Sequence, residues 1–198
     1  MKTLALIMTI LASEMIASAQ NPGSLPPSSV TRLVTIQHVT VTSHRDFAAT
    51  IREFEKQIGT YDPEATKLLG EPNPDFEQIK AKVEAMAGSS GFMQFGVIHK
   101  FGDLLALEGK PAGKANQYVI GNPLIALQMV RHKLGVGLYV PLRVLISEDA
   151  GGVTHLEYDL PSSLLRQFGD PEVDAVALML DEKLNALMSA CASGKDEG

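Results

Sequence analysis

Two runs of β-type residues, joined by a short polar segment, constrain the fold of this chain most strongly. The runs are Pro141–Glu148 and Val153–Tyr158, and Asp149-Ala150-Gly151-Gly152 lies between them. A connection of this length and composition is typical of a β-hairpin. We therefore expect two neighbouring antiparallel strands, and hence a sheet with an apolar face that other elements must cover.

The N-terminal half predicts one strand followed by two helices. The run Val30–Thr42 is rich in Val, Thr and Ile, as strands are. A capping-box pattern beginning at Ser43 opens a helix that ends at Gly59. Asn73-Pro74 opens a second helix, which Gly88 closes.

The C-terminal half adds strands and helices in alternation. Strands are expected at Phe92–His99 and Asn116–Ile120, a helix at Leu124–Lys133, a helical turn at Leu164–Phe168, and a last helix from Asp170-Pro171. The order becomes β-α-α-β-β-α-β-β-α. It predicts an α+β fold with an antiparallel or mixed β-sheet of about five strands, covered on one face by helices.

The composition fits one globular domain. The 198 residues are 45% hydrophobic, enough for one sizeable core, which we assign to a single α+β domain at 30–190. A linker at 20–29 precedes it and a disordered tail at 191–198 follows. The single cysteine, Cys191, can form no disulfide within the chain, and we interpret it as a small residue at the frayed end of the last helix. Intermolecular pairing and a reactive thiol are the alternatives.

The first residues resemble a secretory signal peptide at 1–19. The apolar stretch Thr3–Ala12 is followed by Ala17-Ser18-Ala19, a small-x-small cleavage site before Gln20. With Glu14 inside it, the apolar segment is too short to span a membrane stably. We expect a periplasmic or secreted protein with no stable membrane span after cleavage; an uncleaved anchor or a wrongly assigned start codon is the alternative.

The charge balance argues against nucleic acid as a partner. The chain has 23 Asp and Glu against 17 Lys and Arg, a net charge of −6. No cluster of Lys and Arg is present to neutralise a row of phosphates.

Several sequence blocks together resemble the bacterial domain-of-unknown-function family 302 (DUF302). The resemblance spans residues 88–187, and 43–87 fits it less well because the chain has an additional helix there. It implies a compact α+β domain that forms a homodimer, with no assigned activity. The blocks are Ser90-Gly91-Phe92, His99, Tyr118–Ala126, Leu138–Glu148 and Tyr158–Ser163.

His99 is the first candidate binding residue. Strand alternation from Phe92 places Met93, Phe95, Val97 and His99 on one side, with the imidazole at the strand end, where it can face a pocket mouth. The family resemblance implies an acidic residue directly before this histidine, and here Ile98 stands there. A structural, hydrogen-bonded histidine is the alternative interpretation.

The segment Gly121-Asn122-Pro123 lies between a predicted strand and a predicted helix. Glycine permits a tight turn, asparagine can cap the helix and proline fits its first position. The same helix start can attract an anion, so Gly121 and Asn122 are also candidate ligand-binding residues.

Arg143 lies within an apolar strand, where its charge needs a carboxylate partner or a bound anion. Glu148, Asp149 and Glu157 are the candidate partners, within the chain or at a dimer interface. His99, Gly121, Asn122 and Arg143 thus form the predicted site for a small-molecule or anionic ligand.

A weaker hypothesis places a soft metal or haem iron on His99, Met129 and His132. Methionine as core filler is the alternative. The sequence does not identify a cofactor, and we assign no catalytic residue. The leading hypothesis is a small-ligand-binding or sensing module, ahead of a dimeric interaction protein without ligand and of an enzyme of unrecognised type.

Overall fold

The computed structural model describes residues 28–67, 70–111 and 113–194. The described residues from Val34 onward form one compact unit. The predicted signal peptide at 1–19, most of the predicted linker at 20–29 and residues 195–198 of the predicted tail lie outside the described residues.

A mixed β-sheet forms the centre of this unit. Its strand order is β1-β7-β6-β5-β3-β2, and β4 also pairs with β5. Only the β2–β3 pairing is parallel among the described strands, so the sheet is mixed, as the sequence allowed. In the described ranges it has seven strands rather than about five. The strands are β1 (His38–Thr42), β2 (Gly59–Thr60), β3 (Met93–Gln94), β4 (His99–Lys100), β5 (Ala115–Gly121), β6 (Leu142–Glu148) and β7 (Thr154–Asp159).

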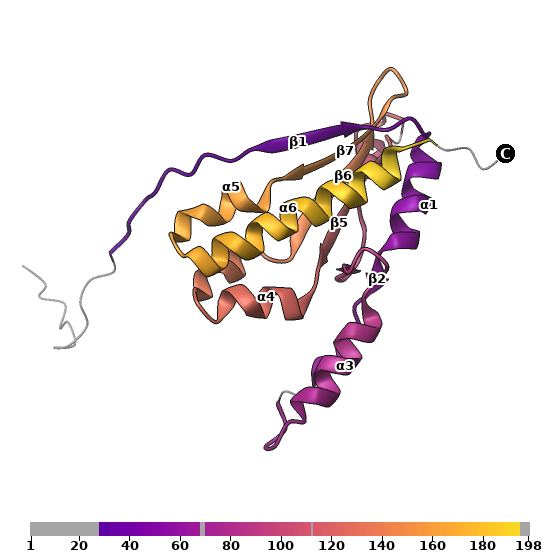
Figure 1. Ribbon diagram of the computed structural model, residues 1–198. Helices are drawn as coiled ribbons and strands as arrows, with labels where there is room; N and C mark the ends of the chain where they lie inside the picture. Colours follow the sequence, from indigo (N-terminus) through magenta and orange to yellow (C-terminus); the bar gives the residue numbers. More distant parts are fainter. Residues whose placement is uncertain (1–27, 68–69, 112, 195–198) are drawn as a thin grey trace, which may run out of the picture. The chain divides into compact units, whose positions relative to one another are not determined.

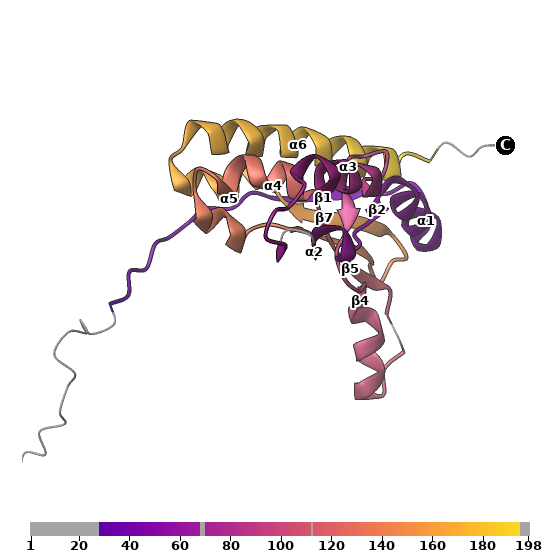
Figure 2. The same ribbon diagram turned by 90° about the horizontal axis from the view of Figure 1, so that it is seen from below.

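Helices pack on one face of the sheet, which confirms the predicted α+β class. Figures 1 and 2 show α1, α4, α5 and α6 on the same side of the strands. The α-helices are α1 (Phe47–Gln57), α2 (Glu64–Lys67), α3 (Phe76–Met86), α4 (Pro123–Val130), α5 (Pro161–Leu165) and α6 (Pro171–Ala192). The 3₁₀ helices are η2 (Phe101–Glu108), η3 (Leu134–Leu138) and η4 (Arg166–Phe168).

The predicted hairpin is confirmed. Strands β6 and β7 pair antiparallel, with Val144 opposite Tyr158. The Asp149 carboxylate accepts hydrogen bonds from the N–H groups of Gly151 (2.8 Å) and Val153 (2.9 Å), which fixes the turn. These bonds to the ionised form hold the pKa of Asp149 below its usual value.

Alternation along the strands decides which side chains enter the core. In β6, Leu142, Val144 and Ile146 are buried against the helices, while Arg143 points to the other face and is exposed. Helix α6 supplies the longest apolar face of the core, through Val173, Ala177, Leu180, Leu184, Leu187 and Met188.

Helix α6 also corrects the interpretation of Cys191. The helix continues to Ala192, and Cys191 is fully buried in the core instead of lying at a frayed end. The packing of the last turn therefore includes the first two residues of the segment predicted as a tail.

The segment predicted as one strand, Phe92–His99, is two short strands. Gly96 has a φ of +67°, which interrupts the extended backbone between β3 and β4. The predicted common side of Met93 and His99 is therefore wrong: Met93 is fully buried and His99 is exposed.

Helix starts differ slightly from the predicted ones. Asp46 caps α1, its carboxylate accepting the Ala49 N–H at 2.7 Å, and Asp75 caps α3 in the same way. Ser43, predicted as the first cap, is buried and bonds the Thr50 hydroxyl instead. Among the described residues, no helix combines the length and the apolar character needed to cross a membrane.

Candidate functional site

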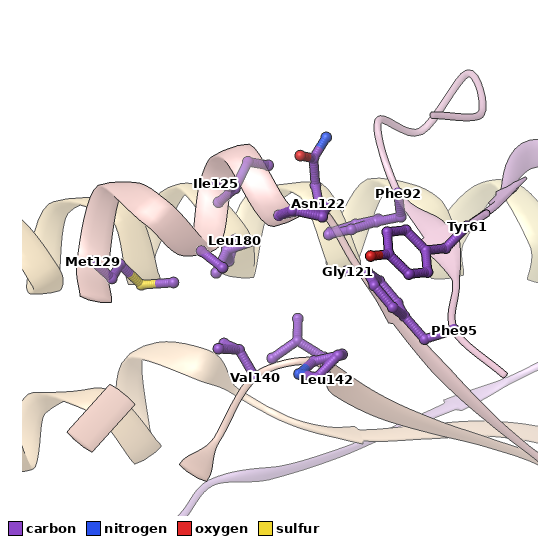
Figure 3. Close-up of a pocket in the computed structure, with 13 residues that line it drawn as sticks. Tyr61, Phe92, Phe95, Gly121, Asn122, Ile125, Met129, Val140, Leu142 and Leu180 are labelled. Carbon is purple, nitrogen blue, oxygen red and sulfur yellow. The ribbon is translucent and has the colours of Figure 1, made fainter. Parts of the chain in front are cut away.

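An apolar cavity of about 280 Å³ lies on the helix-covered side of the sheet. Ile125, Ala126 and Met129 of α4 form one wall, and Val140, Pro141 and Leu142 at the start of β6 form the facing wall. Figure 3 shows these two walls across from each other, with Leu180 of α6 between them at the back.

Three aromatic side chains close one end of the cavity. The rings of Tyr61 and Phe95 stack with centroids 4.5 Å apart, and Phe92 lies beside them. The Tyr61 hydroxyl points toward the cavity in Figure 3, and it hydrogen-bonds the Thr66 hydroxyl at 2.6 Å. The backbone N–H of Tyr61 donates to the Gln94 carbonyl at 2.9 Å, which fixes the ring's position beside β3.

The aromatic end connects the cavity with a second, smaller cluster of buried side chains. Ile79 and Val83 of α3 pack with Met93 of β3, and Tyr61 and Phe95 pack against that cluster. Tyr61 belongs to residues 43–87, the segment that fits the family resemblance less well, so that segment contributes directly to the cavity wall.

Asn122 uses both ends of its side-chain amide at the start of α4. Its Oδ1 accepts the Leu124 N–H at 2.9 Å, and its Nδ2 donates to the Gly91 carbonyl at 3.0 Å. The predicted capping role is confirmed. Pro123 has no N–H, and the Leu124 N–H is taken, so this helix start offers few donors to an anion.

The predicted ligand-binding residues do not converge. Gly121 and Asn122 line the cavity. His99 pairs across from Gln117, and Arg143 across from Val119, on the sheet face opposite the helices. The reason is the strand pleat, since Tyr118, Leu142 and Val144 point to the core and their neighbours point away.

Arg143 also lacks the predicted carboxylate partner. Its side chain is exposed and makes no ion pair with the described residues. Glu148 pairs with Lys114 at 2.8 Å, Asp149 with His155 at 3.1 Å and Glu157 with His38 at 3.4 Å, so all three candidates are engaged elsewhere.

The residues of the metal hypothesis are also apart. Met129 is fully buried in the cavity wall, whereas His132 is exposed after α4 and His99 lies on the far face of the sheet. Within the described ranges, no three His, Cys, Asp or Glu side chains are grouped so that they can hold a metal ion. Met129 acts as core filler, the alternative interpretation.

Two further titratable groups are buried beside α1. Burial raises the pKa of the Cys191 thiol to about 12, so it is protonated and a reactive thiol is not supported. The Tyr118 hydroxyl donates to a Glu55 carboxylate oxygen at 2.8 Å, and burial raises the pKa of Tyr118 well above its usual range.

Sequence reasoning missed Tyr61, Phe95 and Val140 as cavity residues. They come from three segments with no common motif: the β2–β3 pairing places Tyr61 beside Phe95, and Val140 lies on the facing wall. The Tyr61–Phe95 stack had no signal in the sequence pattern.

The architecture defines the class of the protein: an α+β domain with one face of a mixed sheet covered by helices and an apolar cavity beneath α4. The chain belongs to the DUF302 family, "Domain of unknown function DUF302", whose sequence profile matches residues 71–191. A comparison with curated proteins gave no match.

A solved structure supports the same fold. The chain is similar to the crystal structure of an uncharacterized conserved DUF302 protein from Bacillus stearothermophilus, with a TM-score of 0.54 and 19% sequence identity. The match covers 78% of this chain and 97% of the other. At this identity the likeness concerns the fold alone.

Proposed function

We propose that the protein binds a small, largely apolar molecule in the cavity between α4 and the start of β6. The observation that carries this proposal is the cavity itself: about 280 Å³, lined by aliphatic, aromatic and thioether side chains. The cavity opens to solvent, and Pro141 in its wall is exposed, so a ligand can enter it from outside. Ligand sites are typically concave and apolar, with few polar groups.

The lining sets the chemical class of the ligand. Known pockets for drug-sized molecules span about 300–1,000 Å³, so this one suits a ligand at or below the small end of that range. Tyr61 offers the ligand one hydroxyl, which keeps hydrogen-bonding capacity beside its bond to Thr66. The ligand therefore has an apolar body and one polar group, which lies at the aromatic end.

Binding is favoured over catalysis for this cavity. General acid–base chemistry requires a positioned titratable pair in contact with the substrate. Tyr61 is the one titratable residue among the described residues that line the cavity.

We further propose that the protein acts in the periplasm or outside the cell, and that it does so as a homodimer. The signal-like pattern at residues 1–19 supports the first proposal.

The test uses the protein purified from its host without denaturation, followed by native mass spectrometry. We expect a bound mass that is lost on denaturation. Ala126→Phe fills the cavity from α4 and should abolish that mass. Leu127→Phe is the matched control, because Leu127 is the next residue of α4 and is 55% exposed.

Two outcomes contradict the proposal. One is a protein without bound mass that also fails to bind small apolar probe molecules such as indole or naphthol. The other is an Ala126→Phe variant that is folded and still binds as the wild type does.

A further inference from the structure

A short apolar segment projects from the sheet face that carries no helices. We define the apolar arm as residues Val97–Leu107, which include β4 and most of η2. Figure 2 shows the arm extending from the strands on the side opposite α4 and α6. Its large apolar side chains are exposed: Val97 (71%), Phe101 (45%), Leu104 (54%), Leu105 (41%) and Leu107 (85%).

The arm is built into the fold at its base. Gly102 is buried, and its carbonyl accepts the Gly113 N–H at 3.0 Å. A Cβ on Gly102 would lie 2.0 Å from the Gly113 carbonyl oxygen, so only glycine permits this close approach. Gly109 ends η2 in the left-handed conformation. A clamped apolar arm of this kind is a candidate interaction surface, because soluble proteins rarely expose large contiguous apolar patches.

The second surface is the open sheet face, defined by Val119, Arg143, Leu145 and Glu157. Register places Val119 opposite Arg143, and Leu145 opposite Glu157, so an apolar centre has charged neighbours. Arg143 is exposed and makes no ion pair with the described residues. An arginine at the edge of an apolar surface favours a carboxylate partner.

Resting on the homodimer proposed above, we propose that its interface is formed by the apolar arm of one copy packing on the open sheet face of the second copy, with two-fold symmetry. Both surfaces lie on the same side of the molecule, so two copies that face each other each supply one arm and one sheet face. This is the self-complementary arrangement that a two-fold interface requires. It uses the face of the sheet rather than its edges.

The charged residues around the arm favour a second copy of the chain, rather than a lipid surface, as the partner of the arm. Asp103 on the arm makes no ion pair with the described residues, and in the proposed dimer its carboxylate is the partner of Arg143 on the open sheet face of the other copy. A membrane-binding arm needs a cationic surround to approach anionic lipid. Here Lys100 and Lys110 are balanced by Asp103 and Glu108, and the chain's net charge is −6.

The first test is the mass of the full mature protein at micromolar concentration by light scattering. We expect twice the monomer mass for the wild type. Leu104→Glu combined with Leu107→Glu should give a monomer with unchanged circular dichroism, because both positions are exposed. Leu178→Glu on α6, at a leucine on the helix side that is about as exposed as Leu104, should stay dimeric.

The second test locates the contact by disulfide cross-linking. A tagged Leu107→Cys protein mixed with an untagged Leu145→Cys protein should give a tagged–untagged pair on oxidation. Leu178→Cys replaces Leu107→Cys as the control and should give none. The native Cys191 is buried and does not compete.

A monomeric wild type, a dimer insensitive to the arm substitutions, or a dimer without the Leu107–Leu145 cross-link overturns the proposal. So does flotation of the wild type, but not of the arm variant, with vesicles of mixed zwitterionic and anionic lipid. That result identifies a membrane as the occupant of the arm.

Discussion

The side-chain amide of Asn122 ties the start of α4 to the backbone of Gly91. Its Nδ2 donates to the Gly91 carbonyl at 3.0 Å while its Oδ1 accepts the first free N–H of α4, that of Leu124. One residue therefore caps the helix that forms a cavity wall and joins that helix to the segment entering β3. The cavity keeps its shape because these two elements are held together.

The two roles of Asn122 predict graded losses of stability. Asn122→Ser keeps a capping oxygen but loses the bond to Gly91, which should lower the free energy of unfolding by about 1 kcal/mol. Asn122→Ala loses the cap as well and should cost about 2 kcal/mol in all. Urea denaturation measures both. Leu127→Ala, at an exposed site of the same helix, is the control and should change stability by less than about 0.5 kcal/mol. If both Asn122 variants lose the same free energy of unfolding, the cap and the bond to Gly91 do not contribute separately.

Tyr61 should contribute to ligand affinity through its ring more than through its hydroxyl. Its ring stacks on Phe95 at the cavity end, so Tyr61→Ala removes that wall and should weaken binding about tenfold or more, equivalent to about 1.4 kcal/mol. Tyr61→Phe keeps the wall and should retain most of the affinity. Titration with the ligand identified by mass spectrometry gives both values. An alanine variant with wild-type affinity places the ligand elsewhere.

Local signals in the sequence were sufficient for several elements of the fold. The Asp149–Gly152 turn, the cap at Asn122 and the start of α6 after Asp170 each depend on neighbours in the chain, and each is present in the structure. The break at Gly96 was missed because an isolated glycine in a strand pattern does not reveal its φ.

The site was less accessible to sequence reasoning because it depends on packing between distant segments. Arg143 is instructive: Leu142 and Val144 flank it as core residues, so alternation alone puts the guanidinium on the opposite face from α4. Tyr61 and Val140 meet only through the tertiary fold.

The burial of the Cys191 thiol predicts that this cysteine does not react in the folded protein. Burial raises the pKa of Cys191 to about 12, and the Gln57 side-chain amide donates to its sulfur at 3.7 Å. An aromatic disulfide reagent should therefore not label native Cys191, and should label it fully in denaturant. Labelling of the native protein at the rate of a free thiol contradicts the burial, and a cysteine-linked dimer on a non-reducing gel does as well.

Processing at the N-terminus can be tested by mass. If residues 1–19 are a signal peptide, the exported protein should begin at Gln20. Ala19→Leu places a large side chain where the cleavage site requires a small one and should leave the segment attached. Intact-mass measurement of the periplasmic and culture fractions distinguishes the forms. A wild-type protein that keeps its first residues contradicts cleavage.

The edge strand β1 should show a pH dependence that comes from His38. His38 Nδ1 lies 2.9 Å from Asp159 Oδ1 and its Nε2 lies 3.4 Å from Glu157 Oε2, both on the neighbouring strand β7. The hydrogen bond with Asp159 is the main reason that the pKa of His38 is raised above 6.5. A raised pKa in the folded state means that the protonated imidazole stabilises the fold. This contribution is complete below pH 6.5 and is lost as pH rises through the raised value.

His38→Gln isolates this effect from the other titrating groups. The wild type should exceed the variant in free energy of unfolding below pH 6.5, and the excess should vanish at high pH. It should stay below about 1 kcal/mol, because exposed ion pairs contribute little and the His38 side chain is 55% exposed. Amide hydrogen exchange should show the same loss of protection in β1, since only that edge strand is held by this contact. A difference that grows as pH rises contradicts the assignment, because it requires the neutral imidazole to be the form that stabilises β1.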